Sequence, residues 1–127
     1  MVLYWDDPTP DGHDRFWFAR VMSDDHTGQL VRDDFAVDPA RSIESFLDDY
    51  LQEIHAAASI VESLPLETPP QWWPEGMFGD WRLNTLHDVL LHVIVETACH
   101  AGHLDAAREL VDGRTWDYAS GRLTNSE

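Results

Sequence analysis

One stretch, Thr85–Gly113, constrains the fold more than any other part of the sequence; it reads TLHDVLLHVIVETACHAGHLDAARELVDG. Metal-capable side chains recur along it at His92, Glu96, His100 and His103. On an α-helix, at about 100° per residue, these four share an arc of roughly 80°. The apolar residues beside this arc are Leu86, Val89, Val93, Leu104, Ala107 and Val111. We therefore expect Glu96 and His100 in or beside a buried stripe, where a bound cation would offset the cost of burying a carboxylate.

Composition narrows the class of protein. The 127 residues suit a single domain, 1–127, and 43% hydrophobic residues are enough for a core. A net charge of −16, with no lysine and only eight arginines, argues against nucleic-acid binding. Cys99 is the single cysteine, which excludes an intrachain disulfide. With no signal peptide and no long apolar run, we expect a cytoplasmic protein that does not bind membranes.

Two further helices are predicted upstream. Residues 12–22 indicate a short helix that offers Phe16, Trp17, Val21 and Met22 for burial. A long amphipathic helix is predicted over 39–64, beginning at Asp38-Pro39 and ended by Pro65. Its apolar residues recur every three or four positions, at Ile43, Phe46, Leu47, Tyr50, Leu51, Ile54, Val61 and Leu64.

The remaining segments are predicted to be irregular. Residues 1–11 read as an extended arm, 23–38 as a loop, and 114–127 as a polar tail with a frayed end. The linker 65–81 holds four prolines and two glycines, so no helix runs through it. Its three tryptophans, Trp72, Trp73 and Trp81, either pack against the helices or line an apolar pocket for a cofactor or substrate.

These elements predict an all-α protein, a helical bundle with two long helices and one short one. A bundle of four comparable helices would need more than this chain supplies. The uncovered apolar face is expected to be closed by the linker, by the N-terminal arm or by a second copy. We favour a homodimer, since two long apolar stripes exposed to solvent would form a large hydrophobic surface patch.

The pattern LxxVLLHxIxETAxHxGHxDxxRELxDG in the last helix resembles the DinB-like superfamily. It is most similar to the actinobacterial branch that includes mycothiol-dependent maleylpyruvate isomerase and related mycothiol-transferase-like proteins. FWFARVM at residues 16–22 looks like the end of that family's second helix, and the helix 39–64 like its third. The resemblance spans about residues 13–113, and it implies a shortened DinB-like bundle that lacks the family's first helix.

The resemblance implies a divalent metal, zinc or nickel, held by three residues. Two ligands would be Glu96 and His100 on the last helix. In that family the third ligand is a His near the start of the second helix. The corresponding position here lies near Thr9 and Pro10, where there is no His. His13, one helical turn further along, is therefore the candidate. His103 would be a proton-transferring or outer residue, while His92 would orient Glu96.

Two classes of function stay open. In the first, the chain is a metal-dependent enzyme for a small molecule, which performs thiol transfer, isomerisation or hydrolysis, with Glu96 and His103 as catalytic groups and a low-molecular-weight thiol as a possible cofactor. In the second, it is a family member without metal, either a small-molecule-binding protein or one that uses His and Glu as acid–base groups. A truncated product completed by dimerisation is a third reading.

Overall fold

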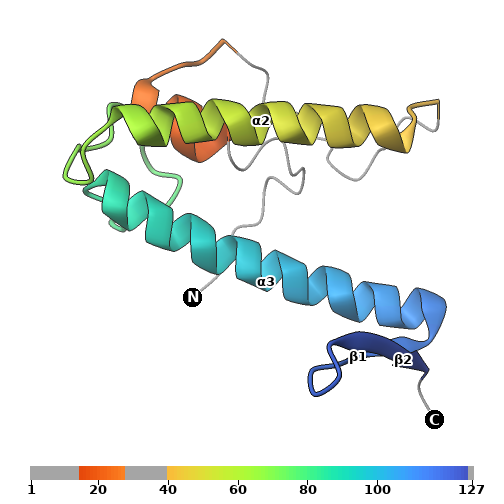
Figure 1. The fold of residues 1–127 in the computed structure, drawn as a ribbon. Helices are drawn as coiled ribbons and strands as arrows, with labels where there is room; N and C mark the ends of the chain where they lie inside the picture. Colours follow the sequence, from red (N-terminus) through yellow and green to blue (C-terminus); the bar gives the residue numbers. More distant parts are fainter. Residues whose placement is uncertain (1–14, 28–39, 126–127) are drawn as a thin grey trace. The chain divides into compact units, whose positions relative to one another are not determined.

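The computed structural model describes residues 15–27 and 40–125. The chain divides into two compact units, residues 1–91 and 92–127. The elements follow in chain order as η1 (Arg15–Met22), α2 (Ile43–Ser63), α3 (Leu86–Asp112), β1 (Arg114–Asp117) and β2 (Arg122–Asn125). Two long helices dominate the ribbon (Figure 1), so the mostly helical fold predicted from the sequence is confirmed. Within the described residues, no helix combines the length and the apolar character needed to cross a membrane.

Helix α2 begins later than the sequence predicted. Its N-cap is Ser42, whose hydroxyl oxygen accepts a hydrogen bond from the backbone N–H of Ser45 at 3.2 Å. The predicted start at Asp38-Pro39 is therefore wrong, because Ser42 satisfies the free N–H groups of the first turn; those two residues lie outside the described part of the chain. The predicted end is confirmed, since the helix stops at Ser63, two residues before Pro65.

The first unit holds a compact apolar core. Among residues 15–27 and 40–125, eight hydrophobic side chains are buried, and all of these belong to the first unit: Phe16, Trp17, Phe18, Val21, Met22, Ala57, Leu86 and Val89. Five of them come from η1, so the predicted burial of this short helix is confirmed. The linker is tied to η1 because the carbonyl oxygen of Val21 accepts from the backbone N–H groups of Gln71 and Trp72.

The second unit contains most of α3 and a β-hairpin. Gly113 ends the helix with a φ of +66°, and its N–H donates to the carbonyl of Glu109 at 2.9 Å, which confirms the predicted C-terminal glycine. The polar segment after it forms a hairpin that the sequence did not predict, in which β1 and β2 pair antiparallel with Trp116 opposite Leu123. The end of the tail, which was expected to be frayed, lies outside the described residues. Gly121 closes the turn, with a φ of +64° and its N–H bonded to the carbonyl of Asp117.

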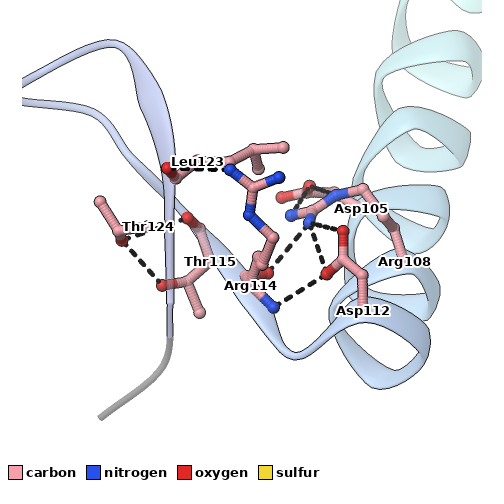
Figure 2. A network of polar contacts seen from close by, with 7 residues as sticks. All are labelled: Asp105, Arg108, Asp112, Arg114, Thr115, Leu123 and Thr124. Atoms are coloured by element: carbon pink, nitrogen blue, oxygen red, sulfur yellow. Dashed lines mark hydrogen bonds and ion pairs between the residues drawn. The ribbon is translucent and has the colours of Figure 1, made fainter.

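A polar network joins the hairpin to the end of α3 (Figure 2). Arg108 donates to Asp105, to both carboxylate oxygens of Asp112 and to the backbone carbonyl of Arg114. The N–H of Arg114 in turn donates to Asp112 at 2.8 Å. The N–H and the carbonyl of the first residue in β1 are thus both bound to side chains of the preceding helix.

Candidate functional site

Helix α3 carries the metal-capable residues within the second unit. Glu96 and His100 are half-buried, as is His92, whereas His103 is exposed. At about 100° per residue, Glu96 and His100 lie roughly 40° apart on one face of the helix. The two predicted ligands therefore share a face and lie neither in the core nor in bulk water.

The apolar side chains on this face change from buried to open along the helix. Leu86 and Val89, in the first unit, are fully buried, whereas Leu104 and Val111, in the second, are 71% and 88% exposed. The continuous buried stripe predicted from the sequence is therefore wrong for the C-terminal half of α3. The buried hydrophobic side chains of the described residues all lie in the first unit, and no residue of 92–125 is buried.

Glu96 and His100 offer two donor atoms of the kinds that zinc and nickel accept, a carboxylate oxygen and an imidazole nitrogen. Residues four apart on a helix are neighbours, about 6 Å apart along the axis. Among residues 15–27 and 40–125, no group of three or more His, Cys, Asp or Glu side chains is placed to hold one ion. His13, the candidate third ligand, lies outside the described residues. Glu96 and His100 are thus two donors of suitable chemistry on one helix face, and the described residues place no third donor with them.

The nucleophilic and basic groups beside this pair are accessible. Cys99 is a free, exposed thiol, and His103 is exposed one helical turn beyond it. An exposed imidazole can take a proton from a bound thiol or water. The C-terminal half of α3 therefore supports acid–base chemistry at a solvent-accessible helix face.

The predicted tryptophans lie in the first unit, where they form part of an aromatic cluster. We use this name for Trp17, Trp73, Phe78 and Trp81, whose ring centroids lie 5.5–6.5 Å apart in every pair. Trp17 stacks on Phe78 with an interplanar angle of 17°. Such separations are those of packed aromatic pairs, so these rings are in contact with one another.

Trp72 lies beside the cluster, 6.3 Å from Phe16 and 4.8 Å from the ring of His26. Trp72 and Trp73 are half-buried, whereas Trp81 is 43% exposed. Two roles were considered for these residues, packing against the helices and lining a pocket. The ring contacts describe packing. Trp81 in addition exposes part of its surface to solvent. Sequence reasoning missed Trp17 and Phe78 as their partners, although the run FWF at 16–18 was a signal for an aromatic contact.

An open pocket of about 350 Å³ lies next to the start of α3, within the first unit. Its lining residues are Leu66, Glu67, Thr85 and His87, and none of them was a predicted site residue. The backbone is fixed here by two hydrogen bonds, from Leu86 N–H to Thr68 and from His87 N–H to Leu66.

Asp88 stabilises the first turn of α3. Its carboxylate accepts from the N–H of Asn84 at 3.0 Å, and its own N–H donates to the hydroxyl of Thr85. The Asn84 hydrogen bond lowers the pKa of Asp88 below its usual value of 3.8. The carboxylate is therefore charged at neutral pH, at the helix end where a negative charge is favourable.

Comparison with models of known protein families gives a match over most of the chain. A family model described as Mycothiol-S-transferase matches residues 12–113, which include all three helices and the linker. The match ends at Gly113, so the hairpin follows it. No curated protein and no solved structure gives a significant match.

Proposed function

Because the chain belongs to the mycothiol S-transferase family, we propose that it is an enzyme that transfers mycothiol, a low-molecular-weight thiol, to a small electrophilic molecule. The matched region contains Glu96, His100 and His103, the residues on which the site was predicted from the sequence. The observation that carries the proposal is the position of Glu96 and His100 on one half-buried face of α3.

We infer that this pair, with His13, holds a divalent ion such as zinc or nickel. A bound ion would supply Lewis acidity, which brings the pKa of a thiol close to neutrality. Glu96 provides a negative oxygen and His100 a neutral nitrogen, so the pair can bind a cation only when His100 is deprotonated. Metal retention should therefore fall in acid, where protons compete with the ion for the imidazole nitrogen.

His103 is the proposed proton carrier. Its exposed imidazole accepts the proton of the thiol, the sulfur forms a bond to the electrophilic carbon, and the proton passes to the departing or newly anionic group. Glu96 is a second proton acceptor on the same helix. Of the three linker tryptophans, Trp81 is the most exposed and would offer its ring to an apolar substrate; Trp72 and Trp73, which are half-buried, are the other members of the proposed binding surface.

We further propose that the enzyme works as a cytoplasmic homodimer. Reduced thiols are kept in that compartment. The open apolar faces of the long helices support association of two copies.

A second candidate function is a metal-free protein that binds a small molecule or uses His and Glu as acid–base groups. It is favoured by one observation: residues 15–27 and 40–125 bring no three metal-capable side chains together. The two candidates differ in whether purified protein retains a divalent ion.

Metal analysis of protein purified without chelator or nickel resin tests the proposal. We expect close to one equivalent per chain, and less than about 0.1 equivalent would favour the metal-free candidate. Glu96→Ala and His100→Ala should each lose the ion. His55→Ala, an exposed histidine on α2, is the matched control and should retain it.

Activity is measured separately, with mycothiol and a chromogenic electrophile. We expect His103→Ala to slow transfer while metal content stays unchanged. If His103→Ala transfers thiol at the unchanged rate across the pH range, its role as the proton carrier is wrong.

A further inference from the structure

The linker carries an arginine beside the aromatic cluster. Arg82 follows Trp81 in the sequence, and its guanidinium carbon lies 5.8 Å from the centre of the Trp73 ring. The rings of Trp73 and Trp81 are in turn 5.8 Å apart. A guanidinium at such a distance is attracted to the face of an indole ring. The first unit therefore holds a positive charge next to an aromatic surface.

The guanidinium of Arg82 keeps its hydrogen-bond donors available. Arg15, Arg41 and Arg108 each donate a hydrogen bond to a carboxylate. Arg82, by contrast, donates no hydrogen bond among the described residues, and its ion pair with Glu75 has an N–O distance of 3.7 Å, which is too long for one. The side chain of Arg82 is 54% exposed and that of Glu75 is 92% exposed. An incoming anion can therefore take the place of Glu75 on this arginine.

The aromatic part of the surface is held in place before any ligand binds. Trp81 is 43% exposed, and Met77, in the same segment, is 54% exposed. Two turns fix the backbone here, because the Met77 N–H donates to the carbonyl of Pro74 and the Trp81 N–H to that of Phe78. The Trp81 ring also packs on the rings of Trp73 and Phe78. A flat ligand that packs on Trp81 would thus lose little free energy in ordering the surface.

We propose that the small molecule bound at this surface is a planar aromatic anion, such as an aryl carboxylate. Its ring packs on Trp81, and its carboxylate binds Arg82. A guanidinium is planar and can donate two parallel hydrogen bonds to one carboxylate. The inference rests on the proposed function, because it names the class of electrophile that receives the thiol and assigns Arg82 as the residue that selects it.

The net charge of −16 makes this one arginine decisive. The chain repels anions at long range, but salt screens charges that lie more than about 8 Å away at physiological ionic strength. The acidic residues of the segment 72–82 are Glu75 and Asp80, and both are exposed to the screening solvent. A neutral aromatic ligand would gain the ring contact alone, and an aromatic cation would be repelled by Arg82. The charge beside the rings therefore favours an anion.

An NMR titration of the full chain with naphthoate tests the inference, with the tryptophan indole N–H signals as the readout. We expect saturable shifts, and we expect the neutral amide of the same ring, naphthamide, to bind at least about fivefold more weakly. In Arg82→Gln the two ligands should bind equally weakly. Arg122→Gln is the matched control, an exposed arginine on the hairpin, and should bind naphthoate as the unchanged chain does.

Glu75→Gln separates anion binding from a packing role of Arg82. It removes the carboxylate that competes for the guanidinium, so naphthoate should bind about two- to threefold more tightly. Asp80→Asn removes an equal charge from the same segment, but Asp80 makes no ion pair among the described residues, and its effect should be smaller. An arginine that only packs on Trp73 would give no gain in Glu75→Gln, and that result would overturn the proposed contact.

Equal binding of naphthoate and naphthamide to the unchanged chain, or no saturable shift up to about 10 mM, overturns the anion site. Circular dichroism confirms that each variant keeps its helices. The titration needs neither mycothiol nor a metal ion. A chain that binds naphthoate through Arg82 but transfers no thiol therefore contradicts the proposed function alone, whereas one that transfers thiol to anionic and neutral aromatic electrophiles with the same KM contradicts this inference alone.

Discussion

Asp112 lies one turn after Arg108 on α3, and both of its carboxylate oxygens are 3.0 Å from Nη1 of that arginine. The same nitrogen reaches the carbonyl of Arg114, the first residue of β1 (Figure 2). No residue from 92 to 125 is buried, so apolar packing contributes little to the position of the hairpin. A two-stranded hairpin is marginal by itself, and polar contacts with the helix end hold this one.

Arg108→Ala should therefore loosen the hairpin while α3 stays helical. The variant loses the donors to Asp105, Asp112 and the Arg114 carbonyl together. Hydrogen exchange of the backbone amides in 114–125 should become faster, with little change in the first unit. Arg122→Ala is the matched control on the hairpin, where we expect a smaller effect because its guanidinium makes no hydrogen bond or ion pair among the described residues.

The hairpin should also loosen in acid. The Arg114 N–H lowers the pKa of Asp112, and the Ser120 hydroxyl lowers that of Asp117, both from a usual value of 3.8. Groups with lowered pKa values stabilise the fold above pH 3.8, and this contribution is lost as the pH falls from 3.8 through their folded values. Carboxyl chemical shifts followed by NMR measure both transitions.

Ser120→Ala gives the control for that titration. Removing the hydroxyl that donates to Asp117 should move the pKa of Asp117 back towards 3.8 and leave that of Asp112 unchanged. An unchanged Asp117 titration would show that the hydroxyl is not the cause of the shift.

The ends of the two long helices were predictable from the sequence because one or two neighbouring residues determine each of them. Gly113 and Pro65 stop α3 and α2 by backbone geometry, which depends on one or two residues. The start of α2 was misplaced because Asp38-Pro39 and Ser42 are both good N-terminal signals. The hairpin was missed because its apolar residues, Trp116 and Leu123, are too few to stand out in a polar segment, although Gly121 and the alternation around it were present.

The site was predictable in part. Which residues share a face of α3 follows from helical periodicity, and Glu96 and His100 do share one. How far each is buried depends on what packs over the helix, and this is a property of distant segments. Leu104 and Val111 show the limit: at about 100° per residue they lie on the same face of α3 as Leu86 and Val89, but they are exposed where those two are buried.

Ser42→Ala should destabilise α2 by about 1 kcal/mol, because it removes the oxygen that accepts from the Ser45 N–H. Ser59→Ala is the matched control within the same helix. The Ser59 hydroxyl donates to the carbonyl of His55, which already accepts within the helix, so its loss should cost little. Chemical denaturation followed by circular dichroism measures both, and equal losses would contradict the capping role.

Leu86→Ala should destabilise the chain by about 2–5 kcal/mol, because the side chain is fully buried and its removal leaves a cavity. Leu91→Ala, five residues along the same helix, removes a side chain that is 51% exposed and should cost much less. Both are measured by denaturation at one fixed protein concentration, since association would shift the midpoint. Similar losses at the two positions would mean that the first turns of α3 are covered on both sides.

The aromatic cluster gives the last prediction, because two of its tryptophans differ in burial but share the same ring partners. Trp17 is 4% exposed and contacts the rings of Trp73, Phe78 and Trp81, so Trp17→Ala should cost about 3–5 kcal/mol. Trp81→Ala should cost less, since 43% of that residue already faces water. If Trp81 belongs to the proposed substrate surface, its variant should raise KM for an apolar electrophile more than it lowers kcat. A Trp81→Ala enzyme with unchanged KM and lowered stability would leave this ring with a packing role alone.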